Sequence, residues 1–362
     1  MAAGNGGVTV LEDRWPRLRG LPRVELARLP TPVQPLPELS RQTGSDLWVK
    51  RDDLTGTAYG GNKVRKLEYL LGDAQRRGAD AILTAGALGS HHVLATSTYA
   101  PSVEMEVHAV MVPQPWSPHV EENLRCTLAA GANLHGAATF GGAAARMLGL
   151  AGTLRAIGNR PYVVAHGGSS PVGAVAYVAA GLELADQILA GEVPEPEAIY
   201  VALGSGGTSA GLAVGLAAAG VTAPVIGIRV TDRMLINRAT VRALINGTVS
   251  RLRGLDARFP EVASLAAKHL RIDGSEFGPG YGHPTWEGRE ASRIALDACH
   301  LALDDTYTAK AFAAMLRDAA VGGRRLLFWQ TLSGVDLSDR LRTAPPAPRW
   351  ALKLAQRADR AS

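Results

Sequence analysis

Short apolar runs alternate with helical segments along most of this 362-residue chain, and this alternation is the feature that most restricts its fold. The runs at 81–84, 107–112 and 198–203 have the length and composition of buried strands, and each is followed by a segment of helical composition. Strands that alternate with helices form a parallel sheet with helices on both faces. The sequence therefore predicts an α/β fold.

The same pattern predicts the remaining regular elements. Further strands are expected at 46–51, near 162–164 and at 224–230, and helices from Asn62 (which could cap its own helix), from Ser90 and over 120–130. Proline is frequent between 21 and 37, which favours extended structure there. No internal repeat of fixed period is present. At 362 residues the chain is long enough for two lobes.

A glycine-rich loop follows the apolar run at 198–203 directly and leads into an Ala/Leu/Val-rich helix. Its residues are Gly204, Ser205, Gly206, Gly207 and Thr208. Bare N–H groups and the positive end of a helix dipole make such a loop an anion site, and a phosphate would suit it. A dinucleotide is a weaker alternative, because the third glycine of Gly-x-Gly-x-x-Gly is replaced by Ser209. No Gly-Lys-Ser/Thr follows either, so the loop is not a Walker A loop.

A second chemical signal is Lys63, which stands between the pair Gly60-Gly61 and the predicted start of a helix. A lysine in a dry pocket near other cations has a lowered pKa and can form a Schiff base with an aldehyde. Lys66 follows three positions later and would share its helix face. The alternative is a solvated basic helix start. Together, an aldehyde-binding lysine and a phosphate loop suggest pyridoxal 5'-phosphate as cofactor.

The segment around Lys63 resembles the cofactor motif of the D-cysteine desulfhydrase and 1-aminocyclopropane-1-carboxylate deaminase family. Similar segments are spread over about 25 to 335, namely 29–32, 49–54, 60–68, 84–86, 168–173, 204–211, 278–282 and 303–310. The resemblance implies a pyridoxal-phosphate enzyme with the two-lobed parallel-sheet fold called fold type II, similar to tryptophan synthase β. It implies a larger lobe from 1–65 and 176–340, a smaller lobe from 66–175, and a tail from 341–362.

The resemblance also implies roles for individual residues. Lys63 would bind the cofactor aldehyde, with Asn62, Lys66 and the 204–208 loop as further cofactor contacts. Ser90 is the expected proton acceptor, and Tyr281 and Tyr307 would act on the substrate. Thr308 would face the pyridine nitrogen, where the cyclopropane deaminases have an acidic residue and the desulfhydrases a threonine. A hydroxyl there would leave the ring less charged. Thr308 could also be a helix cap, and both tyrosines could be core aromatics.

One segment departs from the family pattern. Residues 89–95 read Gly-Ser-His-His-Val-Leu-Ala, whereas the family has a sequence close to Gln-Ser-Asn-His-x-Arg-Gln. This segment would bind the substrate carboxylate and the cofactor ring oxygen, so Ser90, His91 and His92 are expected substrate contacts. His91 could be a new acid or base, or could replace the asparagine at the ring oxygen. Neighbouring histidines point apart on a helix, so no metal site is expected. Leu332, in place of a glycine, implies a reshaped wall near the cofactor.

Composition adds little to these signals. A formal charge of +5 could suggest nucleic acid, but the basic residues are dispersed and only 5% of residues are aromatic, so no nucleic-acid partner is expected. Cys126 and Cys299 are far apart and most simply reduced. No signal-like N-terminus and no stretch near ~20 apolar residues is visible, which predicts a cytoplasmic protein without a membrane partner. A homodimer is expected from the resemblance alone.

Three functions remain open. The first is elimination or deamination of a small amino acid to a keto acid and ammonia. The second keeps the cofactor but replaces, epimerises or ring-opens a specialised amino acid, and it is suggested by His91, Leu94 and Leu332. The third is a non-catalytic binding protein of the same fold, against which the presence of Lys63 and Ser90 argues.

Overall fold

The computed structural model describes residues 9–359, and these residues form two compact units. The first unit contains the described residues up to Tyr69 together with Ser169–Gly334. The second contains Leu70–Gly168 and the described residues from Val335 onward. The resemblance implied boundaries at 66 and 175 and a separate tail from 341. In the structure, that last segment carries helices that belong to the second unit.

The first unit is built on a six-stranded sheet with the order β1-β2-β10-β7-β8-β9. Its strands are β1 (Val33–Pro35), β2 (Asp46–Arg51), β7 (Ala198–Leu203), β8 (Val225–Arg229), β9 (Leu270–Asp273) and β10 (Arg325–Gln330). All neighbours are parallel except β1 and β2, which are antiparallel. The predicted parallel α/β core is therefore confirmed. The strands β1, β9 and β10 were not predicted.

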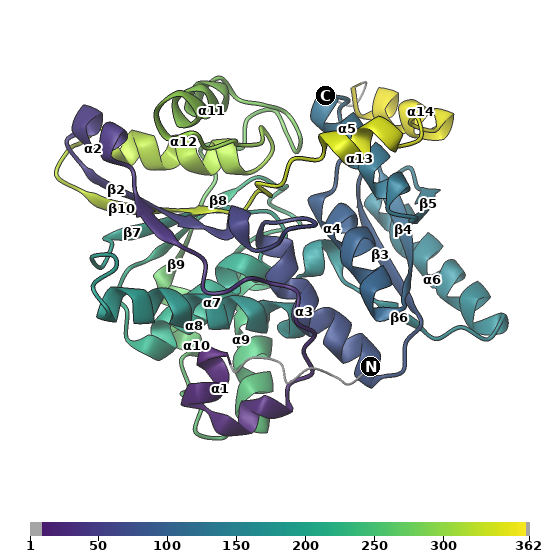
Figure 1. Ribbon diagram of the computed structural model, residues 1–362, viewed down its shortest axis with the longest axis horizontal. Helices are drawn as coiled ribbons and strands as arrows, with labels where there is room; N and C mark the ends of the chain where they lie inside the picture. The colour runs from purple at the N-terminus through teal and green to yellow at the C-terminus, as the bar shows by residue number, and fades with distance from the viewer. Residues whose placement is uncertain (1–8, 360–362) are drawn as a thin grey trace. The chain divides into compact units, whose positions relative to one another are not determined.

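Helices cover both faces of this sheet, with α11 and α12 on one face and α7 to α10 on the other (Figure 1). The helices of the unit are α1 (Val10–Arg14), α2 (Pro37–Thr43), α3 (Asn62–Arg76, which continues into the second unit), α7 (Pro171–Leu189), α8 (Gly207–Ala219), α9 (Arg238–Leu255), α10 (Ala263–His269), α11 (Trp286–Cys299) and α12 (Thr308–Ala319), with short 3₁₀ helices at Pro16–Gly20 and Asp52–Leu54. Each face thus has its own apolar cluster.

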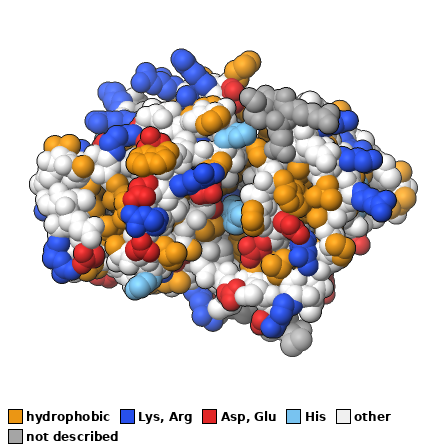
Figure 2. Space-filling model, turned by 90° about the horizontal axis from the view of Figure 1, so that it is seen from above, with side chains coloured by type: hydrophobic (Ala, Val, Ile, Leu, Met, Phe, Trp, Pro, Cys, Tyr) orange, Lys and Arg blue, Asp and Glu red, His pale blue; other side chains and the backbone are white. Residues whose placement is uncertain are grey.

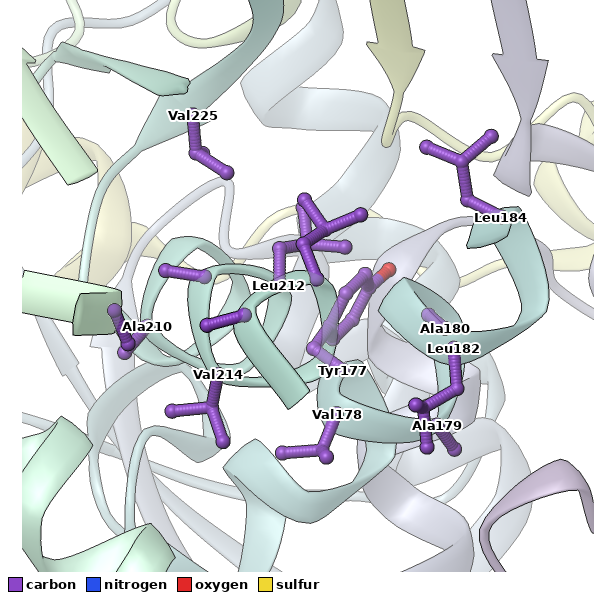
Figure 3. Packing of buried hydrophobic residues seen from close by; sticks show 14 of the residues in the cluster. Tyr177, Val178, Ala179, Ala180, Leu182, Leu184, Ala210, Leu212, Val214 and Val225 are labelled. Carbon is purple, nitrogen blue, oxygen red and sulfur yellow. The ribbon is translucent and has the colours of Figure 1, made fainter. Parts of the chain in front are cut away.

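The helices α7 and α8 pack unusually closely because glycines face the opposite backbone. A Cβ atom on Gly215 would lie 2.3 Å from the carbonyl oxygen of Val178, and one on Gly211 would lie 2.4 Å from that of Ala174. Figure 3 shows side chains of both helices, among them Val178, Leu212 and Val214, in the surrounding core. This packing fixes α8, whose first two residues, Gly207 and Thr208, are also the last two of the glycine-rich loop.

The helix α7 bears on the expectation that no stretch of the chain approaches the ~20 apolar residues that span a membrane. Contrary to that expectation, its span Pro171–Leu189 is long and apolar enough to cross a membrane by length and composition. However, 72% of the apolar stretch is buried inside the protein. Its side chains Val175, Val178 and Leu182 belong to the main hydrophobic cluster of the first unit. The helix is therefore accounted for as a core helix.

Replacing Gly215 with alanine is expected to destabilise the protein by about 1–3 kcal/mol, because the new methyl group must push α7 and α8 apart. Gly149 is a matched control, since it lies inside α6 (Phe140–Ala156) and a Cβ added to it would have no other atom within 4 Å. Gly149→Ala is expected to stabilise by up to about 1 kcal/mol. Urea unfolding of both variants checks the prediction, and equal effects would contradict it.

The second unit is built on a four-stranded, wholly parallel sheet with the order β5-β4-β3-β6. Its strands are β3 (Ala81–Ala87), β4 (Glu106–Val112), β5 (Asn133–Gly136) and β6 (Pro161–Val163), and its helices are α4 (His91–Tyr99), α5 (Pro118–Ala129), α6, α13 (Ser338–Thr343) and α14 (Arg349–Asp359), with 3₁₀ turns at Ala100–Val103 and His166–Gly168. Ala351 and Leu354 of α14 pack in one cluster with Met111 and Leu124. The last helix of the segment from 341 therefore packs in this core, whereas the resemblance implied a separate tail.

Charged side chains of both signs are interspersed on the molecular surface. Figure 2 shows Lys and Arg side chains scattered among acidic and apolar ones on the visible face. Several pair with acids, as Arg293 does with Glu290 and Asp297. On the face seen in Figure 2, basic side chains thus lie among acidic ones.

Candidate active site

Lys63 and Lys66 lie in the first turns of α3, which begins at Asn62. The turn before the helix depends on Gly61, which has φ +82° and would place a Cβ only 2.5 Å from the carbonyl oxygen of Thr331. The amide N–H of Asn62 donates to that same carbonyl at 3.1 Å. The segment around Leu332 therefore lies against the turn that carries Lys63, where a reshaped wall was predicted.

Lys63 is half-buried and Lys66 is buried, in contrast to the alternative of a solvated basic helix start. Burial lowers the pKa of Lys63 from 10.5 to about 8, although the charge of Asp304 opposes this shift. Lys66 is only 1% exposed, and burial together with the charge of Lys63 lowers its pKa well below the usual value. A bound anion would offset the cost of keeping these two amines close together.

The glycine-rich loop joins β7 to α8 and is shaped by Gly206 and Gly207. Gly206 has φ +90°, a conformation that favours glycine, and it precedes the first residue of α8. A Cβ on Gly207 would come within 2.7 Å of the Ser169 hydroxyl oxygen. The Gly207 N–H donates to that oxygen at 2.9 Å, and the hydroxyls of Ser169 and Ser205 are 2.7 Å apart.

The loop and the start of α3 meet in the first unit. The Asn62 amide donates to the Thr208 hydroxyl at 3.1 Å, and the Lys66 ammonium donates to Ser169 at 3.4 Å. Asn62 is therefore the first residue of its helix and contacts the loop, where a capping role was one expectation. Two signals that are about 140 residues apart in sequence thus form one site, with cations on one side and helix N–H groups on the other.

Two tyrosines complete this part of the site. The Tyr281 and Tyr307 hydroxyl oxygens are 2.5 Å apart, and the rings meet edge to face. The Tyr307 ring lies against the loop, since a Cβ on Gly204 would be 3.0 Å from its Cε1 atom. Burial raises the pKa of Tyr281 to about 12 and that of Tyr307 well above its usual value. Both hydroxyls are therefore neutral hydrogen-bonding groups near neutral pH.

Thr308 begins α12 and is tied to Asp304. The Asp304 carboxylate accepts hydrogen bonds from the N–H groups of Thr306 and Tyr307 and from the Thr308 hydroxyl. Asp304 thus satisfies the start of α12, a role that the sequence had offered to Thr308. Because its charge acts on Lys63 and on both tyrosines, Asp304 lies among the predicted site residues.

Ser90, His91 and His92 belong to the second unit, at the start of α4. Ser90 is the N-cap of the helix, and its hydroxyl accepts from the Val93 N–H at 3.3 Å. The two histidines point apart, as predicted. The Nε2 atom of His92 is 3.2 Å from the Thr84 hydroxyl, whereas that of His91 is 3.1 Å from Nε2 of His119.

His91 is part of a small polar cluster with His119 and Asn123 of α5. The Asn123 amide nitrogen donates to the Gly89 carbonyl at 2.9 Å and lies 3.4 Å from Nδ1 of His91 and 3.2 Å from Nε2 of His119. An amide nitrogen only donates, and its second hydrogen can serve either Nδ1 of His91 or Nε2 of His119. A ring nitrogen that accepts carries no hydrogen, so either choice leaves Nε2 of His91 as the donor between the two rings. The arrangement therefore assigns the hydrogen between the two rings to Nε2 of His91. Within residues 9–359, no group of three or more His, Cys, Asp or Glu side chains could hold a metal ion.

Replacing His119 with alanine is expected to destabilise the protein by about 1 kcal/mol, because His91 loses the acceptor of its Nε2 hydrogen. His119→Gln offers an oxygen acceptor and is expected to lose less. ¹⁵N spectra of the wild-type imidazoles, with urea unfolding of both variants, check this. A wild-type His91 that carries its hydrogen on Nδ1 would contradict the assignment.

Four residues of these clusters were missed by the sequence analysis as site residues, namely Ser169, Asp304, His119 and Asn123. Ser169 and Asp304 lie in segments that matched the family pattern, so that signal was available. His119 is 28 positions from His91, and no local pattern connects them.

Comparison with known proteins supports the cofactor. A family model described as pyridoxal-phosphate dependent enzyme matches residues 24–329. D-cysteine desulfhydrase of Salmonella paratyphi B is 36% identical over 305 residues, which cover 83% of this chain and 89% of that enzyme. The same values hold for the D-cysteine desulfhydrase of Salmonella enteritidis.

Solved structures agree on the fold. The crystal structure of an ACC deaminase homologue matches with a TM-score of 0.76 and 31% identity, over 93% of this chain and 99% of that one. Threonine deaminase isoform 2 from Solanum lycopersicum matches with a TM-score of 0.59 at 16% identity, over 97% of this chain and 90% of that one. The second likeness concerns the fold alone.

Proposed function

Because the chain belongs to the family of pyridoxal-phosphate-dependent enzymes, we propose that it acts on a small amino acid by α,β-elimination or deamination and releases a keto acid and ammonia. The observation that carries this proposal is the meeting of Lys63 and Lys66 with the Ser205–Thr208 loop. When bound, pyridoxal 5'-phosphate supplies an aldehyde that joins amines and a pyridine ring that withdraws electrons.

The residues present fit this cofactor. Lys63 keeps some exposure to solvent and has a lowered pKa, so its amine suits attachment to an aldehyde. The N–H groups at the start of α8, with Lys66 and Ser169, suit a phosphate. Asn62 would hold the loop to α3, and Thr308 would face the pyridine nitrogen.

The remaining predicted residues would handle the substrate. Tyr281 and Tyr307 share a hydrogen bond, and their raised pKa values keep both hydroxyls neutral, so they would act on the substrate amine or its proton through hydrogen bonds. Ser90 would accept a proton, and the free Lys63 amine would move one at Cα. His91 and His92 would help to place the substrate, although His91 would do so while hydrogen-bonded to His119.

The relatives name the first substrate to test. D-cysteine desulfhydrases are 36% identical to this chain, and an ACC deaminase homologue of known structure is 31% identical. We therefore propose D-cysteine as the leading substrate. A second candidate function is replacement, epimerisation or ring opening on a specialised amino acid. It is favoured by the polar cluster around His91, because His91 stands where the family pattern has an asparagine.

The attachment of the cofactor is expected to become faster as the pH rises through about 8, because only the neutral amine attacks an aldehyde. At about pH 7, roughly a tenth of Lys63 amines are neutral, and the neutral fraction levels off above about pH 9. A lysine with the ordinary pKa of 10.5 would still gain reactivity there. Stopped-flow absorbance of cofactor-free protein mixed with pyridoxal 5'-phosphate measures the profile, and a rise that continues past about pH 10 would contradict it.

A substrate panel tests the proposed function. Purified protein is loaded with pyridoxal 5'-phosphate and given D- and L-cysteine, D-serine, β-chloroalanine and aminocyclopropane carboxylate, with keto acid, ammonia and sulfide measured. Brisk keto-acid release from D-cysteine is expected. Absence of visible absorbance from the lysine-bound cofactor would overturn the proposal. Cofactor binding with racemised or substituted amino acid and no keto acid would replace it with the second candidate.

We also propose a cytoplasmic homodimer. The cysteines Cys126 and Cys299 are both free, which suits a reducing compartment. Sedimentation equilibrium of the loaded enzyme tests the subunit count, and a mass of one chain at all concentrations would refute the dimer.

A further inference from the structure

The Thr308 hydroxyl is held on two sides by one residue, Asp304. It donates its hydrogen to the Oδ2 atom of Asp304 at 2.8 Å, and it accepts the backbone N–H of Asp304 at 2.8 Å. Both residues are buried, with 1% of Thr308 and 6% of Asp304 exposed. Water therefore does not compete for these two hydrogen bonds.

The carboxylate cannot easily turn away from Thr308. Its Oδ1 atom accepts from the N–H groups of Thr306 at 3.0 Å and Tyr307 at 2.7 Å, and Oδ2 also lies 3.3 Å from the Thr308 nitrogen. The charges of Lys63 and Lys310 act on the same carboxylate. Asp304 is thus held in a fixed orientation, with both carboxylate oxygens used as hydrogen-bond acceptors.

The number of hydrogen bonds that a hydroxyl can make decides whether Thr308 donates to a ligand or accepts from it. A hydroxyl has one hydrogen and two lone pairs. The hydrogen is used by the Asp304 carboxylate and one lone pair by the Asp304 N–H, so a single lone pair remains. Toward any group in the site, Thr308 is therefore an acceptor.

We propose that Asp304 is a positioning residue that makes Thr308 a hydrogen-bond acceptor and thereby holds the pyridine nitrogen of the cofactor in its protonated form. The inference rests on the proposed function, in which Thr308 faces that nitrogen. It differs from the expectation from sequence that a threonine leaves the ring less charged. A nitrogen that meets only a lone pair must bring its own hydrogen, and a protonated ring withdraws electrons more strongly.

The test is ¹⁵N NMR of the full-length enzyme loaded with cofactor labelled at the pyridine nitrogen. Free cofactor in acid and in base supplies the reference shifts of the protonated and neutral ring. Wild-type enzyme is expected to give the protonated shift. In Asp304→Asn, the side-chain oxygen stays with the two N–H groups, the new amide donates to Thr308, and the freed hydroxyl hydrogen can point into the site. The nitrogen is then expected to shift toward the neutral value.

Two variants at Thr308 separate polarity from structure. Thr308→Ser keeps the hydroxyl and is expected to match the wild type, whereas Thr308→Val removes it and is expected to give the neutral shift. A neutral ring in the wild-type enzyme overturns the inference, as does a protonated ring in Asp304→Asn or in Thr308→Val. If Asp304→Asn does not bind cofactor, the Val and Ser variants decide. Loss of lysine-bound absorbance in the wild type would instead refute the proposed function.

Discussion

Replacing Lys63 with alanine is expected to lower kcat/KM for every amino-acid substrate by on the order of 10⁴-fold or more, the loss that follows removal of a covalent catalytic group. Lys63 is the amine at the start of α3 whose pKa burial lowers to about 8, next to the loop that would bind the phosphate. Without it, no amine at this position would hold the aldehyde, and the group proposed to move the Cα proton is lost. Keto-acid release under saturating cofactor measures the effect.

The control variants separate the amine from its charge. Lys63→Arg keeps a cation but cannot attach to an aldehyde, so it is expected to be as inactive as Lys63→Ala. Lys268 is an exposed lysine on α10, and Lys268→Ala is expected to leave turnover unchanged. Absorbance spectra should show cofactor bound to lysine in the wild type and in Lys268→Ala only. Wild-type turnover in Lys63→Ala would remove the covalent role.

The parts of this site that sequence reasoning found are those encoded in contiguous residues. The glycines after β7 and the glycine pair before Lys63 are local signals, since each meets a backbone demand of its own turn. The strand predicted at 198–203 coincides with β7, because a short unbroken apolar run is typical of a buried strand. Local chemistry therefore pointed to both segments that make up the proposed cofactor site, and the two are in contact.

The parts that it missed depend on tertiary contacts. The short strand β1 contains Pro35 and is defined by its pairing with β2, which no pattern within three residues reveals. His119 becomes relevant only because α5 brings it to His91. Asp304 lies in a matched motif that suggested no role for it. Its role follows from the backbone N–H groups and the Thr308 hydroxyl that donate to its carboxylate. Such roles need coordinates, since residue type alone leaves the hydrogen-bond partner open.

Loss of Arg65 is expected to cost a large part of the protein's stability. Arg65 lies between the two lysines of α3 but is itself buried, and its guanidinium donates to Asp52 at 2.8 Å and to Glu183 at 2.9 Å. Lys50 also donates to Glu183, at 2.6 Å. The other carboxylate oxygen of Asp52 accepts from Tyr177 and Trp329. This network anchors the helix that carries Lys63 to the core of the first unit.

Arg65→Met is expected to destabilise the protein by about 3–5 kcal/mol, because it keeps the bulk but leaves two buried carboxylates with too little positive charge. The matched control is Arg293→Met, which breaks two exposed ion pairs on α11 and is expected to change stability little. Urea unfolding near neutral pH compares the two. A loss in Arg65→Met as small as in the control would mean that the network contributes little to stability.

The stability lost in Arg65→Met is expected to depend on pH in a definite direction. Burial raises the pKa of Glu183, but the charges of Arg65 and Lys50 outweigh it and lower the pKa from 4.5 to about 2. A carboxylate whose pKa is lower in the folded state contributes its stabilisation above the unfolded pKa and loses it as the pH falls through the folded one. The difference between wild type and Arg65→Met is therefore expected to be largest above about pH 4.5 and to shrink toward pH 2. The stability lost through poorer packing alone would not depend on pH. A difference in unfolding free energy that stays constant across this range would therefore assign the effect to the changed side-chain volume. The charge network would then not be what holds α3.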